Sequence, residues 1–163
     1  GAVPLPGVDA ALAEAGRVLA RARAAKAPII HIVHKGQAGG AFDLDGAGGQ
    51  IAPQVAQAGS ETIIQKDLPN AFAGTTLHDT LQELNTKNLI FVGFMTHMCV
   101  SASVRAALDL GYRSTLVSAA AATRDLPTPS GGVIDAASLH DASLAALGDR
   151  FAIIVERADQ LPG

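Results

Sequence analysis

The segment 88-NLIFVGFMTHMCVSASVRAALDLGYRSTLVS-118 decides the fold, because it places two apolar runs on either side of a helical pattern. Residues 88–93 form an apolar run that ends in glycine, as expected of a strand buried on both faces. A helix is predicted over 97–110, with Gly111 as its C-terminal cap, and a second strand is predicted over 113–118. A strand, a helix and another strand in this order predict two parallel strands joined by a crossover helix.

The same alternation of strands and helices continues on both sides of this segment. Further helices are predicted over 8–25, 75–84 and 133–147, further strands over 28–34, 61–66 and 151–156, and loops over 36–50 and 123–132. This order predicts an α/β fold, a three-layer α-β-α sandwich around a doubly wound parallel sheet. No internal repeat interrupts the pattern, so we interpret residues 1–163 as a single domain.

Composition and charge narrow the range of functions. The chain has 163 residues, of which 48% are hydrophobic and 17% charged, and this composition is typical of a globular protein. The net charge is −3 without a basic run, which argues against nucleic acid or an anionic membrane as a partner. The apolar runs are shorter than the ~20 residues that span a bilayer, and we expect no secretion signal. A single cysteine excludes an intrachain disulfide and fits a cytoplasmic location.

That single cysteine, Cys99, falls in the first turn of the helix predicted over 97–110. Cysteine attacks as the thiolate, and the unpaired N–H groups of a helix N-terminus stabilise a thiolate. The same N–H groups could bind the oxyanion of an acyl-transfer reaction. Free cysteine is also a common inert core residue, so its position alone leaves both interpretations open.

Other polar residues are expected near Cys99, because the carboxyl ends of parallel strands lie at the same edge of a sheet. Lys66 ends the strand predicted over 61–66, and His34 ends the strand predicted over 28–34. The turn before Cys99 and the loop after Ser118 reach the same edge. A lysine ammonium beside a thiol stabilises the thiolate. The sequence therefore predicts a site at this edge that contains Cys99 and Lys66.

Two sequence blocks carry a resemblance to a known family. The first is 93-GFMTHMCV-100, followed by 111-GYRSTLVSAAAATRD-125, and the second is 64-IQKDLPNAFAGTTLHDTLQEL-84. Together they resemble the isochorismatase-like cysteine hydrolase superfamily, in its non-nicotinamidase branch, over nearly the whole chain. The resemblance implies a parallel sheet of strand order 3-2-1-4-5-6.

The resemblance also implies a mechanism. Cys99 would be the nucleophile, Lys66 the catalytic lysine, and the backbone N–H groups of Met95 and Cys99 the oxyanion site. A cis peptide bond between Phe94 and Met95 is expected from the same family pattern. The implied activity is hydrolysis of an amide-type C–N bond of a small molecule through a thioester. The alternatives are hydrolysis of a vinyl ether, as in isochorismatases, and an inactive homo-oligomeric protein that keeps the fold.

One part of the family pattern is missing. The family carries a general-base Asp on its first strand, whereas this chain starts at 1-GAVPLPG-7, which resembles the segment after that strand. Strand 1 would lie between the strands predicted over 28–34 and 88–93, so two central strand edges are expected to lack partners. We expect the strand and its Asp either to precede Gly1 or to come from another chain. If neither is the case, we expect catalysis to be lost.

The remaining expectations concern the pocket and its partners. Residues 31 and 34 are both histidines. Because they are three positions apart on a strand, their side chains face opposite sides of the sheet and cannot chelate one ion. We therefore predict no metal, and we also predict no cofactor. An ion pair is expected between Arg124 and Asp125. The expected partners are a small-molecule substrate and further copies of the chain, in a dimer or larger homo-oligomer. The substrate pocket is predicted to contain His34, Phe42, Phe72, Thr96 and His97, with His97 as a less favoured candidate base.

Overall fold

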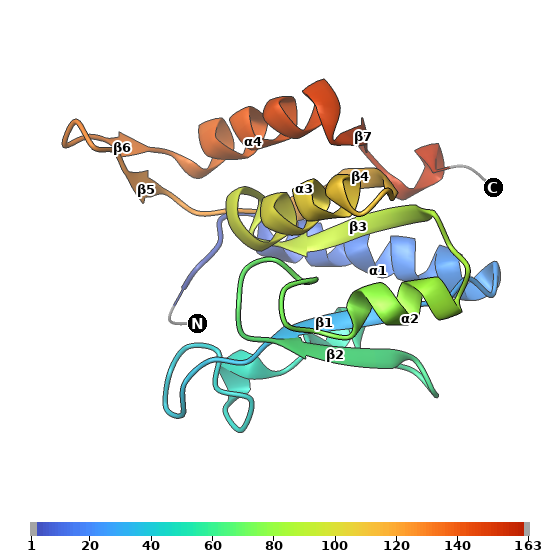
Figure 1. Ribbon diagram of the computed structural model, residues 1–163. Coiled ribbons are helices and arrows are strands. Elements are labelled where there is room, and N and C mark those ends of the chain that lie inside the picture. The colour runs from blue at the N-terminus through green and yellow to red at the C-terminus, as the bar shows by residue number, and fades with distance from the viewer. Residues whose placement is uncertain (1–2, 162–163) are drawn as a thin grey trace.

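The computed structural model describes residues 3–161 and has the predicted α/β architecture (Figure 1). The helices are α1 (Val8–Ala24), α2 (Leu77–Glu83), α3 (Ser101–Asp109) and α4 (Ala136–Arg150). The strands are β1 (Ile30–His34), β2 (Thr62–Lys66), β3 (Asn88–Phe94), β4 (Arg113–Ala122), β5 (Leu126–Pro127), β6 (Val133–Ile134) and β7 (Ala152–Val155). Within the described part of the chain, no helix has both the length and the apolar character that crossing a membrane requires.

The strands form two parallel sheets and a short hairpin. β1 pairs with β2 in one parallel sheet, and β3, β4 and β7 form the other in that order. These pairings are the neighbours that the predicted strand order requires. Within residues 3–161 no strand bridges β1 and β3, so the full order 3-2-1-4-5-6 is not observed as one hydrogen-bonded sheet and stays a prediction.

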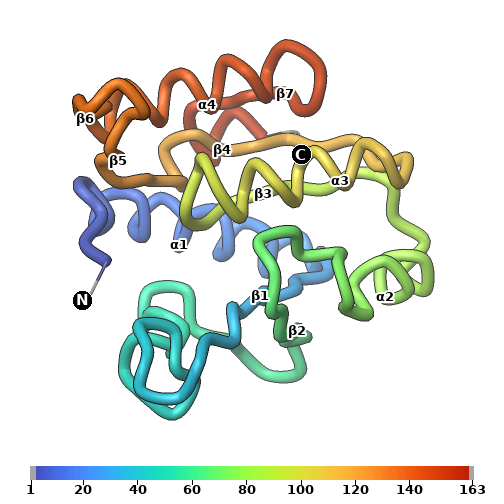
Figure 2. The backbone as a smooth tube through the Cα atoms, turned by 60° about the vertical axis from the view of Figure 1, so that its left-hand side comes forward, coloured from blue at the N-terminus to red at the C-terminus, as the bar shows by residue number. Residues whose placement is uncertain are grey.

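Helices cover both faces of the larger sheet, because neighbouring residues on a strand point to opposite sides. On β4, Val117 packs with Ala15 and Val18 of α1. Leu116, the preceding residue, packs with Val104 of α3 and Leu147 of α4. Figure 2 shows α1 and α4 on opposite sides of β4. The predicted three-layer arrangement is confirmed around this strand.

A second core joins the two sheets. It contains Ile64 of β2, Leu81 of α2, Ala107 of α3 and the buried ring of Tyr112, which precedes β4. The hydroxyl of Tyr112 is bonded to Nδ1 of His78 on α2, at 2.9 Å. Among residues 3–161, side-chain packing across α2 therefore holds β1 and β2 against the larger sheet, and no continuous ladder of backbone hydrogen bonds joins them.

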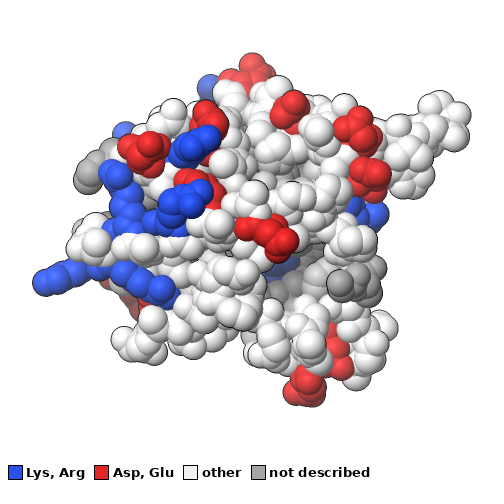
Figure 3. Space-filling model, turned by 180° about the vertical axis from the view of Figure 1, so that it is seen from behind, with Lys and Arg blue, Asp and Glu red and all other residues white. Residues whose placement is uncertain are grey.

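The arginines of α1 are used for structure. Figure 3 shows blue side chains gathered at one end of the face seen from behind. Arg17 Nε donates to Glu14 at 2.8 Å, and Arg23 Nε donates to Glu61 at 2.7 Å. Arg21 donates to the Leu161 carbonyl at 2.7 Å. Arg17 thus makes a bond within α1, Arg23 ties α1 to the segment before β2, and Arg21 ties it to the C-terminal segment.

Three features differ from the sequence prediction, namely the end of β4, the hairpin strand β5 and the start of α4. The strand predicted over 113–118 continues to Ala122, since small alanines let it stay paired with β3. The loop predicted over 123–132 contains β5, which forms the hairpin with β6. The last helix starts at Ala136, because the Asp135 side chain accepts the Ser138 N–H at 2.9 Å and caps it.

The packing around β4 makes a testable prediction. Leu116→Ala removes a side chain that is 0% exposed and lies between α3 and α4, so the cavity left behind should lower the free energy of unfolding by about 2–5 kcal/mol. Urea unfolding followed by circular dichroism measures this change. The matched control is Leu110→Ala, at a position 39% exposed, which should cost less than about 1 kcal/mol. Equal effects of the two substitutions would contradict the packing described.

Candidate active site

Cys99 lies in a π-helical turn that follows β3. The turn spans Thr96–Val100, so the structure corrects the prediction that Cys99 opens an ordinary α-helix. The peptide bond between Phe94 and Met95 is cis, as the family resemblance implies. The carbonyl of Met95 accepts the N–H groups of Met98, at 3.1 Å, and of Val100, at 3.2 Å, which are the neighbours of Cys99. This pair of bonds does not use the N–H of Cys99.

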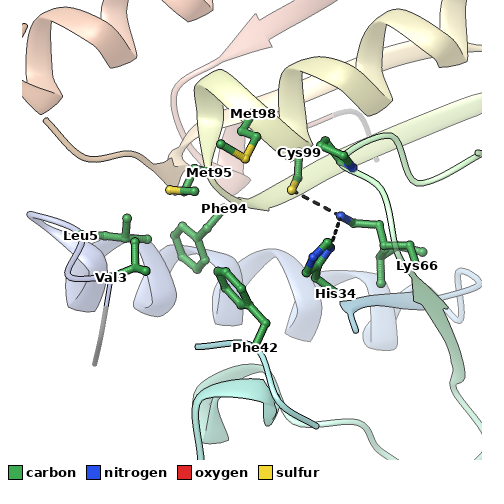
Figure 4. Close-up of a pocket in the computed structure, with 11 residues that line it drawn as sticks. Val3, Leu5, His34, Phe42, Lys66, Phe94, Met95, Met98 and Cys99 are labelled. Carbon is green, nitrogen blue, oxygen red and sulfur yellow. Dashed lines mark hydrogen bonds between the residues drawn. The ribbon is translucent and has the colours of Figure 1, made fainter. Parts of the chain in front are cut away.

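Lys66 lies beside the cysteine sulfur and is 5% exposed. Its Nζ donates to Cys99 Sγ at 3.3 Å and to His34 Nδ1 at 3.3 Å (Figure 4). It also donates to the Leu68 carbonyl at 2.9 Å. A lysine ammonium has three donor hydrogens, and each has an acceptor here. The ammonium of Lys66 is thus in direct contact with the sulfur of Cys99.

His34 ends β1 and lies opposite Lys66 in the register of the two parallel strands. Burial lowers the pKa of His34, and the positive charge of Lys66 lowers it further, whereas Asp67 acts in the opposite direction. The ring is therefore neutral at neutral pH. Because Nδ1 accepts a hydrogen bond from Lys66, the single ring proton must be on Nε2.

A cavity of about 180 Å³ opens over these residues. Of the residues predicted for the site, His34, Phe42, Lys66, Met95 and Cys99 line it. Six further residues line the cavity that the sequence did not predict for the site, namely Val3, Leu5, Ile32, Pro69, Phe94 and Met98. Pro69, Phe94 and Met98 are close in sequence to predicted residues, whereas no sequence motif marked Val3 and Leu5. Among the described residues that line the cavity, none is a carboxylate.

Three residues predicted for the pocket lie outside the lining of the cavity. Phe72 stacks on Tyr112, with ring centroids 5.8 Å apart, and packs against the core that joins the sheets. Thr96 is 0% exposed, and its hydroxyl is bonded to His140 Nδ1 at 2.9 Å. His97 Nδ1 is bonded to the Thr123 hydroxyl. Thr96 and His97 thus fasten the turn that carries Cys99, and neither contacts the space above the sulfur.

His140, which the sequence did not predict for the site, also supports this turn. His140 ties the turn to α4, and no sequence motif marked it. The predicted ion pair between Arg124 and Asp125 does not form. The Asp125 carboxylate accepts the Ala136 N–H at 2.8 Å. Arg124 instead donates to the Asp125 backbone carbonyl at 3.4 Å. Burial is the largest cause that lowers the pKa of both His97 and His140, and Arg124 adds to it for His97.

The two histidines of β1 have separate partners. His31 Nε2 contacts Glu61 Oε2 at 2.8 Å, whereas His34 contacts Lys66. Between residues 3 and 161, no group of three or more His, Cys, Asp or Glu side chains is arranged to hold a metal ion.

Comparisons with known proteins found relatives in sequence and in fold. A family model described as an isochorismatase domain matches residues 2–159. The crystal structure of an isochorismatase from Pseudomonas putida KT2440 has a TM-score of 0.95 and 46% identity, and covers 99% of this chain and 82% of its own. The secreted isochorismatase effector Isc1 of Verticillium dahliae is 30% identical over 98% of this chain and 82% of its own length. A streptothricin hydrolase of Streptomyces noursei is 32% identical over 94% of this chain and 62% of its own length.

The contact between Lys66 and Cys99 predicts how fast the thiol reacts. Lys66→Met keeps most of the side-chain volume but removes the ammonium 3.3 Å from the sulfur, so alkylation of Cys99 by iodoacetamide at neutral pH should slow about 10- to 100-fold. Mass spectrometry of the alkylated protein measures the rate. The control is Lys87→Met, at an exposed position before β3 and at the other end of that strand from Cys99. Unchanged alkylation in Lys66→Met would show that the ammonium does not activate the sulfur.

The histidines predict a dependence of stability on pH. His34, His97 and His140 all have a pKa below the usual 6.5 in the folded protein. The unfolded chain therefore binds more protons as the pH falls from about 7 to about 5, and the free energy of unfolding should decrease, by at most ~1.4 kcal/mol per pH unit for each histidine. Urea titrations at several pH values measure the slope. In His140→Gln the slope should be shallower, and stability that stays flat or rises on acidification would contradict this account.

Proposed function

Because the chain belongs to the isochorismatase family of hydrolases, we propose that it is a cysteine-dependent hydrolase that cleaves an amide-type C–N bond of a small molecule through a thioester on Cys99. The observation that carries this proposal is the 3.3 Å contact between the Lys66 ammonium and the Cys99 sulfur at the wall of a cavity. A paired thiolate facing a small cavity is the arrangement that nucleophilic catalysis by cysteine requires.

In the first half of the reaction, the Cys99 thiolate attacks the substrate carbonyl carbon. Negative charge develops on the carbonyl oxygen, and we assign its stabilisation to the backbone N–H groups of Met95 and Cys99. Both residues line the cavity, and the bonds from Met98 and Val100 to the Met95 carbonyl hold the turn between them. A preorganised donor of this kind typically contributes about 10²- to 10³-fold to the rate.

In the second half, water attacks the thioester and releases the acid. The complete cycle needs a proton on the departing amine and a base for the attacking water. Lys66 stays beside the sulfur throughout and stabilises the thiolate when it leaves. Its ammonium is the single cation among the described lining residues of the cavity.

The chemistry of the cavity favours a small, uncharged amide with an apolar acyl group. The walls are built mainly from Leu5, Ile32, Phe42, Phe94 and Met98, and the hydrogens of Lys66 already have acceptors. Isochorismate carries two carboxylates, whereas the described lining offers one cation, Lys66, whose hydrogens already have acceptors, so desolvating both carboxylates would be costly. Similar proteins are named both isochorismatase and streptothricin hydrolase, so isochorismate is tested beside the amides.

This proposal predicts a substrate class and a dependence on the sulfur. In a panel of small neutral amides and isochorismate, the wild-type protein should release amine or ammonia from an apolar amide and leave isochorismate intact. Cys99→Ala should lower amide hydrolysis by about 10³-fold or more, because it removes the nucleophile. A coupled assay for ammonia and chromatography of the products measure both activities.

The same panel separates the alternatives. Isochorismate hydrolysis that survives Cys99→Ala would favour the vinyl-ether activity, which needs no thiolate. No turnover of any member of the panel, by protein with a cooperative unfolding transition, would favour the inactive assembly protein.

A further inference from the structure

A second cavity, of about 200 Å³, lies on the opposite face of β1 and β2 from the first cavity, which has Cys99 in its wall. Its own walls come from these two strands and from residues 44–51 of the segment between them. We propose that the second cavity is a regulatory site for a small uncharged molecule that carries a ring and an amide. The bound molecule acts on the first cavity through residues 36–49, named the Phe42 loop below. The regulatory role rests on the proposed function, because it takes the first cavity as the active site.

The alternation of side chains along the two strands places the two cavities back to back. Neighbouring residues of a strand point to opposite faces of the sheet. On β1, His34 lines the first cavity and Val33 lines the second. On β2, Lys66 lines the first cavity and Gln65 lines the second. The thickness of one sheet therefore separates a molecule in the second cavity from His34 and Lys66.

The lining of the second cavity determines the charge of the molecule that it can hold. Its apolar side chains include Ile51 and Ile63, and no charged side chain is among the described lining residues. A charged molecule would lose its hydration there without gaining a partner, which is costly. An apolar cavity of about 150 Å³ holds a benzene ring in another protein. The second cavity therefore has room for an uncharged ring with one small substituent.

Two glutamines supply the polar groups of the second cavity. The amide nitrogen of Gln50 donates to the Leu44 carbonyl, which fixes one wall. Within residues 3–161, the side-chain amide of Gln65 has no hydrogen-bond partner. An amide group has both a donor and an acceptor, so the amide of a bound molecule can form two hydrogen bonds with Gln65. This pairing selects a ring that carries an amide over a bare hydrocarbon.

The Phe42 loop connects the two cavities, because it lines both. Phe42 lines the first cavity, and Leu44, two residues later, lines the second. Asp43, between them, fixes the backbone of the loop. Its carboxylate accepts the N–H groups of Gly39, at 2.7 Å, and of Asp45, at 3.0 Å. A molecule that packs against Leu44 therefore acts on Phe42 through a segment that these bonds hold together.

The Phe42 loop also contacts the end of β1. The Gly36 N–H donates to the Phe42 carbonyl at 2.9 Å, and the Phe42 ring lies edge-on to His34, with centroids 5.4 Å apart (Figure 4). Six residues of the loop are glycines, so its ordering costs more backbone entropy than that of an average segment. Contacts of a bound molecule with Leu44 and Gln50 offset part of this cost. Binding therefore favours the arrangement in which Phe42 covers His34.

Benzamide is the probe for the second cavity, because it is an uncharged ring that carries an amide. Hydrogen–deuterium exchange with mass spectrometry follows the peptides that cover residues 36–50 as benzamide is titrated. The rate at which iodoacetamide alkylates Cys99 reports on access to the first cavity and needs no turnover. Gln65→Leu keeps the size of the side chain but removes the amide. Gln54→Leu, at an exposed position outside the lining, is the matched control.

In the wild type, benzamide should slow both hydrogen exchange in the Phe42 loop and alkylation of Cys99 by about 5-fold or more, because the ordered loop narrows the first cavity. Gln54→Leu should respond in the same way. Gln65→Leu should lose both responses, and so should Ile63→Phe, which fills the second cavity with a ring. Because these two substitutions differ in chemistry, the test stays decisive if one of the variants does not fold.

Three results would overturn the regulatory site. Responses that persist in Gln65→Leu and Ile63→Phe would show that benzamide acts from the first cavity. Slower hydrogen exchange with unchanged alkylation would show that the second cavity does not control the first. No response of the wild type up to the solubility limit of benzamide would show that the second cavity does not bind this class of molecule. The absence of amide hydrolysis, with both responses intact, would instead contradict the proposed function and leave the second cavity and its coupling to Cys99 standing.

Discussion

The rest of the site depends on the buried ammonium of Lys66. A charge removed from water is tolerated only when each of its hydrogens has an acceptor. Here the acceptors come from three places in the chain, namely Cys99 in the turn after β3, His34 at the end of β1 and the Leu68 carbonyl after β2. Holding the cation in place therefore also holds the nucleophile and the histidine in place.

Packing between the sheets determines whether these acceptors meet. Lys66 and His34 belong to one sheet, whereas Cys99 follows a strand of the other. The core around α2 and Tyr112 links the two sheets, and Ile32, which lines the cavity, packs against it. A substitution in that core can thus change the distance between Lys66 and Cys99 without replacing a residue of the cavity lining. Stability and activity are expected to be coupled through this core.

The sequence was sufficient to predict the three layers of the fold and the site residues at the strand ends. Alternating patterns predicted the fold, and parallel strand ends predicted that Lys66, His34 and Cys99 would meet. The rest depends on tertiary contacts that leave no local pattern, such as the contact of Thr96 with α4 or the stacking of Phe72 on the core. The homo-oligomer and the cytoplasmic location stay predictions from the sequence.

In the proposed reaction, Cys99 attacks a carbonyl whose oxygen is then held by the backbone. A crystal structure of the protein soaked with a small aliphatic aldehyde tests this most directly, because the thiohemiacetal resembles the tetrahedral intermediate. The account predicts continuous density from Cys99 Sγ to a tetrahedral carbon, with the oxygen in hydrogen-bond range of the N–H groups of Met95 and Cys99. An ordered site without aldehyde on Cys99, or an oxygen turned away from both N–H groups, would contradict it.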